Sequence, residues 1–165
     1  MIVELIGCFD RTIAYILELV GDLRDDEMIL QPPGAPNHAA WTLGHVIQSC
    51  QAIAGELDVE PWLPAEWASL FGYGSSTQAV AGSAYASRDV LTAHLAGARD
   101  RLTAALLAID STRLREPLPD PESALILPTT ADALLQIVVA HTAYHAGQLA
   151  AWRRAIGRDP VGVFI

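Results

Sequence analysis

Two histidines lie one helical turn apart within an otherwise apolar pattern. His141 and His145 belong to residues 131–154, where apolar side chains recur at steps of three and four, the spacing of one face of an α-helix. Two imidazoles at positions i and i+4 can bind a single metal ion. Because burying an imidazole without a partner costs free energy, these rings need a partner. The pair therefore predicts one edge of a metal site.

A third histidine, His45, lies on another helix-like segment, residues 38–57. Two ligands from one helix and one from a neighbour would make a three-histidine site with coordination positions open for water or substrate, as in catalytic centres. Imidazole suits zinc, nickel, copper and iron, so the residues do not identify the divalent metal. A metal with an open position lowers the pKa of bound water or binds a thiolate.

The same residues allow plainer interpretations. An HxxxH pair arises by chance on helices, and His45 alone is typical of a core histidine with a satisfied partner. A zincin protease is excluded, because Thr142 occupies the position of the glutamate base in HExxH. His38, in the first turn of the second predicted helix, is expected to face solvent. His94, beside the apolar stripe of the third, is a candidate pocket residue.

Other side chains near the histidines are further candidates for lining a pocket. Trp41 and Gln48 share the stripe of the histidine on the second helix; the tryptophan would either line the pocket or pack in the core. Tyr144 and Gln148 flank the last histidine of the fourth helix. The tyrosine would line the pocket or pack between helices, and the glutamine could hydrogen-bond a ligand, a water or a metal-bound ring. The residues assign no catalytic side chain.

Four amphipathic segments would position these side chains. Their apolar stripes predict helices over residues 2–23, 38–57, 88–109 and 131–154, the last one uninterrupted. Asn37 is the expected N-cap of the second helix, and the fourth ends near Gly157. Arg153 and Arg154 are expected to be surface charges that complement the helix dipole.

Long connections separate the last three of these helices. Residues 58–86 are rich in proline, tryptophan, glycine and serine, which predicts a crossover or a cover over a site. Residues 113–129 form a second connection that contains prolines. Together these features predict an all-α four-helix bundle, in one domain over residues 1–165. A long crossover between the second and third helices would make them parallel, in up-down-down-up order.

The amino-acid composition limits the classes of binding partner that are expected. Nineteen acidic residues face ten arginines and no lysine, for a formal net charge of −9; because such a surface repels phosphate backbones, no nucleic-acid partner is expected. The absence of long uncharged apolar runs and basic amphipathic segments predicts no membrane association. Cys8 and Cys50 lie on apolar helical faces, as expected of reduced thiols in a cytoplasmic protein. The apolar C-terminal tail and the 58–86 connection leave a homodimer open.

Two segments resemble the motifs on helices 2 and 4 of the DinB/YfiT-like superfamily. Residues 37–46 read NHAAWTLGHV, and residues 141–149 read HTAYHAGQL. The two segments follow the family's order at about its separation, and the resemblance covers nearly the whole chain. It implies a four-helix bundle in which three histidines hold a divalent metal such as zinc, nickel or iron. These histidines match His45, His141 and His145.

Characterised members of that superfamily include thiol S-transferases that use mycothiol, bacillithiol or glutathione, and a mycothiol-dependent maleylpyruvate isomerase. The resemblance therefore implies a metal-dependent enzyme in which a low-molecular-weight thiolate attacks an electrophilic small-molecule substrate. A composition rich in alanine and arginine and free of lysine is typical of GC-rich genomes, which favours mycothiol. The alternatives are a non-catalytic, stress-related metal- or ligand-binding bundle and a plain helical interaction module.

Overall fold

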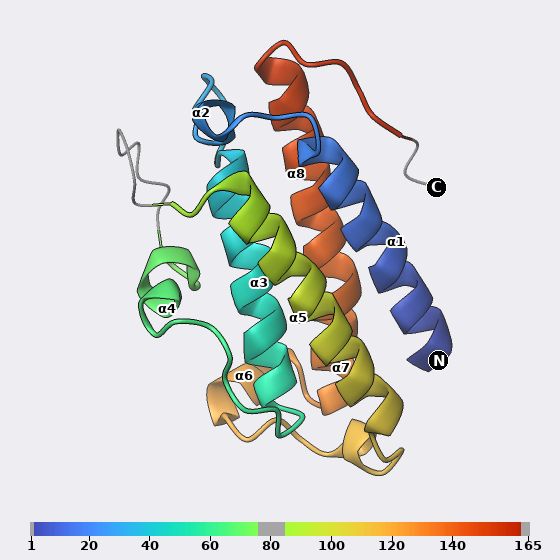
Figure 1. Cartoon of the computed structure of the whole chain (residues 1–165). Helices are drawn as coiled ribbons and strands as arrows, with labels where there is room; N and C mark the ends of the chain where they lie inside the picture. Colours follow the sequence, from blue (N-terminus) through green and yellow to red (C-terminus); the bar gives the residue numbers. More distant parts are fainter. Residues whose placement is uncertain (1, 76–84, 163–165) are drawn as a thin grey trace.

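The computed structural model describes residues 2–75 and 85–162, and its long helices lie side by side (Figure 1). Three of them are α1 (Ile2–Val20), α3 (Ala39–Gly55) and α5 (Arg88–Ala108). The fourth is a composite of α7 (Thr130–Leu134), the π-helical segment η2 (Leu135–His141) and α8 (Thr142–Ala155). Helix α1 packs against both α5 and α8, and so does α3. The predicted all-α four-helix bundle is therefore confirmed.

The helices follow the predicted up-down-down-up order (Figure 1). The chain rises along α1 to the short helix α2 (Asp25–Met28), descends along α3 and again along α5, and returns upward through α7 and α8. Helices α3 and α5 are parallel neighbours, and the described start of the connection between them, residues 56–75, lies outside the bundle (Figure 1). This connection carries the short helix α4 (Glu66–Phe71). The connection before α7 carries η1 (Arg113–Arg115) and α6 (Pro121–Ile126).

The apolar stripes form a continuous core between the long helices. Because the stripe positions recur every three to four residues, each helix turns one face inward along its whole length. Burying each large apolar side chain contributes about 1.5–3 kcal/mol. Fully buried examples from the four helices are Phe9, Ile13, Ile16, Leu43, Ile47, Leu91, Leu95, Leu149 and Trp152.

His38, and not Asn37, is the N-cap of α3. The Nδ1 atom of His38 accepts a hydrogen bond from the backbone N–H of Trp41 at 3.1 Å. The His38 ring is fully buried and packs edge-on against Tyr85, with 4.6 Å between ring centroids. Two predictions were therefore wrong. An imidazole nitrogen serves as the capping acceptor in place of the Asn37 side chain, and this role draws His38 away from solvent.

The fourth helix is not the uninterrupted α-helix that was predicted. Residues Leu135–His141 form a π-helical segment, in which each turn is wider than in an α-helix. Thr142 is buried, and its Oγ1 donates to the carbonyl of Ile137, five residues earlier, at 2.9 Å. The hydroxyl thus satisfies a carbonyl inside the widened turn. Because His141 ends this segment, the wider turn changes the direction in which its ring points.

A capping residue precedes the fourth helix, and a glycine in a left-handed conformation follows it. Thr129 caps α7 and forms a reciprocal capping box with Asp132. After α8, Gly157 has a φ of 81°, a left-handed conformation that favours glycine. The fourth helix therefore ends near Gly157, as its sequence predicts.

Arg153 is buried, and the prediction that it is a surface charge was wrong. Its guanidinium donates to both carboxylate oxygens of Asp22 and to the carbonyls of Leu19 and Asp159, the latter two at 2.9 and 2.6 Å. The hydrogen bond from Arg153 is the main reason why the pKa of Asp22 falls to about 2. Arg154, the next residue, is exposed as predicted. Arg153 thus ties α8 to the end of α1.

Replacing Arg153 by alanine is expected to lower the free energy of unfolding by about 2–4 kcal/mol, because two carbonyls lose their buried donor. Urea unfolding followed by circular dichroism measures the change. The matched control is Arg154→Ala, an exposed neighbour, which should change stability by less than about 0.5 kcal/mol. Equal effects of the two substitutions would show that the buried guanidinium does not hold α8 to α1.

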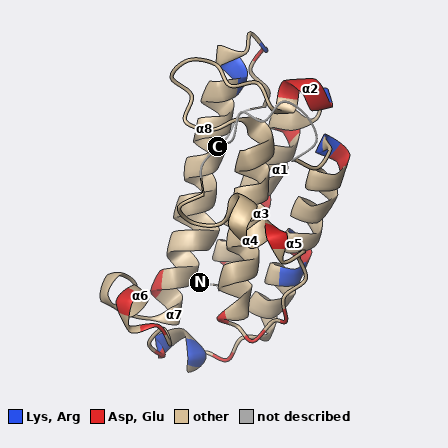
Figure 2. Cartoon of the chain, turned by 90° about the vertical axis from the view of Figure 1, so that its left-hand side faces the viewer, with Lys and Arg blue, Asp and Glu red and all other residues tan. Residues whose placement is uncertain are grey.

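Charged residues are unevenly distributed over the helices. In Figure 2 red and blue segments lie around α2, around α6 and along α4 and α5, while the middle of α8 is tan. Among residues 2–75 and 85–162, no helix combines the length and the apolar character needed to cross a membrane.

Candidate metal centre

Three histidine rings meet inside the bundle. His45 comes from α3, His141 from the end of η2 and His145 from α8. The Nε2 atom of His141 lies 3.1 Å from the Nε2 atoms of both His45 and His145. Each ring offers one nitrogen, and these nitrogens all lie within 4.8 Å of one another. The arrangement could hold one metal ion.

The backbone carbonyl of Phe71 determines which nitrogen His45 can offer. The Nδ1 atom of His45 lies 2.6 Å from this carbonyl oxygen. Because a carbonyl oxygen only accepts hydrogen bonds, Nδ1 must carry the proton. In the neutral ring, Nε2 then has a free lone pair, which points toward the other two histidines. A hydrogen bond of this kind is the usual way in which proteins orient a metal-binding imidazole.

Hydrogen bonds alone cannot satisfy the three converging nitrogens. His45 offers a lone pair at Nε2, so the contact to His141 needs a proton on the Nε2 of His141. That single proton points along one direction, and the contact between His141 and His145 is then left with no proton directed along it. A cation that accepts all three lone pairs removes this conflict. The donor set therefore fits a divalent metal of the kind that imidazole prefers.

The surroundings keep all three rings neutral. Burial, with a smaller contribution from the neighbouring histidines, lowers the pKa of His141 to about 4 and of His145 to about 3. Burial also lowers the pKa of His45, although its hydrogen bond to Phe71 opposes the change. Neutral imidazole is the form that binds metals, so the burial that disfavours protons prepares the rings for a metal ion.

The same shifts make the stability of the metal-free protein depend on pH. Between about pH 3 and pH 6.5, the unfolded chain binds more protons at these histidines than the folded protein does. The free energy of unfolding should therefore rise with pH in this window, by up to about 1.4 kcal/mol per pH unit for each histidine. Their contribution is complete above pH 6.5 and is lost as the pH falls.

Urea unfolding of chelator-treated protein between pH 4.5 and pH 7 measures this slope. Carboxylates also titrate near the lower limit, so the informative quantity is the difference between the native protein and a His141→Gln, His145→Gln double variant. The variant should show a shallower slope. Identical slopes would contradict the assignment of neutral, buried rings.

Trp41 packs flat on the His45 ring, with 4.6 Å between ring centroids and 10° between the planes. It also lies edge-on to His145 at 6.3 Å. Its Nε1 donates to Ser75 Oγ at 3.2 Å, which connects the tryptophan to the outer connection. Trp41 is therefore a buried wall beside the histidines, and its contact with a ligand stays a prediction.

The other predicted pocket residues lie at different distances from the cluster. Tyr144 is 62% exposed and touches the edge of the His145 ring. Gln148 lies beside His145 and raises its pKa. The buried Oε1 atom of Gln148 makes no hydrogen bond with the described residues. His94 lies apart from the cluster, on α5, where its ring meets Trp67.

A cavity of about 450 Å³ opens beside two of the three rings, His45 and His141. Its walls come from α3, from η2, from the connection that contains α6, and from residues that follow α4. Most of the lining surface is apolar, and besides the two histidines the polar side chains are Gln48, Ser49, Glu56 and Ser123. This size and character suit a small-molecule ligand.

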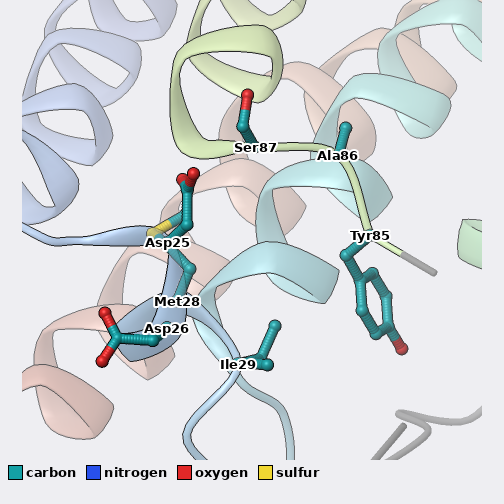
Figure 3. A pocket seen from close by; sticks show the side chains of 7 residues that line it. All are labelled: Asp25, Asp26, Met28, Ile29, Tyr85, Ala86 and Ser87. Atoms are coloured by element: carbon teal, nitrogen blue, oxygen red, sulfur yellow. The ribbon is translucent and has the colours of Figure 1, made fainter. Parts of the chain in front are cut away.

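A second cavity, of about 310 Å³, lies elsewhere, where α2 faces the start of α5 (Figure 3). Asp25, Met28 and Tyr85 are among its lining residues, and none of the three clustered histidines contributes to it. Of these two cavities, the first is therefore the one that adjoins the three-histidine cluster.

A family model, that of the DinB superfamily, matches residues 9–149. The chain belongs to the DinB superfamily. Among solved structures, a conserved protein from Enterococcus faecalis matches this DinB-superfamily chain with a TM-score of 0.72 and 18% sequence identity. The match covers 93% of this chain and 96% of the other, and it supports the fold. A comparison with curated proteins found no match.

Phe71 is the part of this DinB-superfamily site that sequence reasoning missed. Its contribution is a backbone carbonyl, which no side-chain pattern reveals. Gly44, beside His45 on α3, is what lets it approach, since a Cβ at this position would overlap the Phe71 ring. Gly44 within the motif of helix α3 is therefore the one signal in the sequence for this contact.

Substituting Gly44 by alanine is expected to displace Phe71 and to break its hydrogen bond to His45. Losing a group that orients a metal ligand typically costs 10- to 100-fold in metal affinity, so the dissociation constant for zinc should rise by about that factor. Competition with a chromogenic chelator measures it. The matched control is Gly97→Ala on α5, where a Cβ meets open space; it should leave the affinity unchanged. An unaltered affinity in the Gly44→Ala protein would refute the role of Phe71.

Proposed function

We propose that His45, His141 and His145 bind one divalent metal ion and that the protein is a metal-dependent thiol transferase. The observation that carries the proposal is the convergence of three Nε2 atoms from neutral rings at the edge of an apolar cavity. With three protein ligands, a tetrahedral or larger coordination shell keeps at least one position open. A divalent metal bound there would supply Lewis-acid chemistry, holding a thiol as its thiolate at neutral pH.

The nucleophilic thiol must come from outside the chain. Cys50 is buried on α3, and burial raises its pKa to about 12, so it remains an unreactive thiol at neutral pH. Cys8 lies on α1 and does not line the cavity. A low-molecular-weight thiol is the external nucleophile that this proposal requires, as in the characterised transferases that the chain resembles.

The residues of the chain would bind and orient the two reactants. The apolar walls would hold the electrophilic substrate and exclude water from it. Phe71 would keep the His45 ring in position through its carbonyl, and Trp41 would prevent that ring from rotating. In the reaction, the sulfur forms a bond to an electrophilic carbon, the leaving group departs from that carbon with the bonding electron pair, and the thiol proton passes to solvent.

The proposal has a cytoplasmic setting, where low-molecular-weight thiols are kept reduced. A homodimer stays a prediction.

The experiment begins with elemental analysis of protein purified without a metal-affinity column. We expect about one equivalent of zinc, nickel or iron per chain, and its loss from a His141→Ala variant. The control variant is His94→Ala, which removes a histidine outside the cluster and should retain the metal. Full occupancy in the His141→Ala protein would refute the three-histidine site.

The second stage tests catalysis with the metal-loaded protein. Mycothiol, bacillithiol and glutathione are each offered with a generic electrophile such as monochlorobimane, and conjugate formation is followed by fluorescence. We expect conjugation above the uncatalysed rate with at least one thiol, and its loss in the His141→Ala protein. Bound metal without conjugation, together with a melting temperature that falls on chelation, would instead support a bundle with a structural metal.

A further inference from the structure

The cavity beside the histidines has a second polar end, formed by Glu56. This residue follows α3 directly as its C-cap and lines the same cavity as His45. Eleven residues of helix separate the two, which corresponds to about 16 Å along the helix axis. A ligand that fills the cavity would thus have one end at the histidines and the other near a carboxylate.

The position of Glu56 is unfavourable for the helix itself. A helix C-terminus carries a partial negative charge, so an acidic residue there lowers stability. Departures from local stability rules of this kind occur characteristically at functional sites. A carboxylate at this place in an apolar cavity therefore calls for a positively charged or hydrogen-bond-donating partner.

The nearest guanidinium leaves this carboxylate available. Arg113 donates to the backbone carbonyl of Glu56 at 3.0 Å and attracts its carboxylate. However, the same guanidinium forms a salt bridge with Glu116 and lies 4.0 Å from Asp58. One positive charge thus faces three carboxylates. The region around Glu56 remains acidic.

Two further polar side chains of the cavity wall, Gln48 and Ser49, offer acceptor atoms. The Oε1 atom of Gln48 is buried and has no hydrogen-bond partner among the described residues. The hydroxyl of Ser49 donates to the carbonyl of His45 at 2.8 Å, which leaves its oxygen as an acceptor. No lysine or arginine is among the described lining residues, and residues 76–84 contain no ionisable side chain in the sequence.

We infer that this cavity selects a largely apolar ligand that ends in an ammonium or another hydrogen-bond donor, and that Glu56 is the residue that determines this specificity. The inference rests on the proposed function, because it concerns the ligand of the same site. A ligand carboxylate at this end would meet Glu56 and the acidic residues beside it, and like charges repel. Thiols that carry carboxylates, such as glutathione, fit this end of the cavity poorly.

The test uses three probes with the same eight-carbon chain: octylammonium, octanol and octyl sulfate. Each is titrated into the metal-loaded protein, and binding is followed from the amide NMR signals of residues that line the cavity. We expect octylammonium to bind at least tenfold more tightly than octyl sulfate, with octanol between them. In a Glu56→Gln variant, the ratio of the two dissociation constants should fall to near one.

The matched control is Glu18→Gln, which removes one negative charge from an exposed position on α1, outside the cavity. This variant should keep the native ratio. Equal or tighter binding of octyl sulfate to the native protein would overturn the inference, and so would an unchanged ratio in the Glu56→Gln protein. Because the probes contain no thiol, the result can be read even if no thiol transfer is found. Conversely, thiol transfer without this selectivity would leave the proposed function standing.

Discussion

The convergence of three imidazole nitrogens in a buried place is the constraint on which the rest of the structure depends. Hydrogen bonds cannot satisfy all three atoms, because His45 already gives its one proton to Phe71. Burial adds a second restriction, since it lowers the pKa values of the rings and prevents protons from relieving the conflict. A divalent cation would accept the lone pairs of all three nitrogens without requiring any ring to be protonated.

The three rings can converge only if α3 and the fourth helix keep fixed positions relative to each other. The widened turn of η2, with Thr142 satisfying a carbonyl inside it, directs the His141 ring. At the far end of α8, Arg153 binds the end of α1 through Asp22. On α3, Gly44 admits Phe71, whose carbonyl orients His45. These contacts come from η2, α8 and α3, so the geometry of the cluster depends on the whole bundle.

The cavity beside the cluster has two chemically different ends. One end lies at His45 and His141, which would hold the metal of the proposed site, and the other end meets Glu56 in an acidic region. A ligand with two different ends would therefore bind in a single orientation, with its reactive group at the histidines. This polarity connects the proposed thiol chemistry to a ligand class, because the charge at the far end discriminates between molecules that could all reach the histidines.

The sequence by itself determined the four helices, their up-down-down-up order and the three histidines. Apolar periodicity reports which face is buried, and the two motifs carry the side chains of the site. Tertiary structure decided what depends on backbone groups or distant partners. The Phe71 carbonyl has no side-chain signature, and the capping role of His38 depends on its ring nitrogen. Arg153 reads as a surface charge until Asp22 is brought beside it. The π-helical turn likewise became visible only in the structure, because apolar periodicity alone predicts an ordinary α-helix.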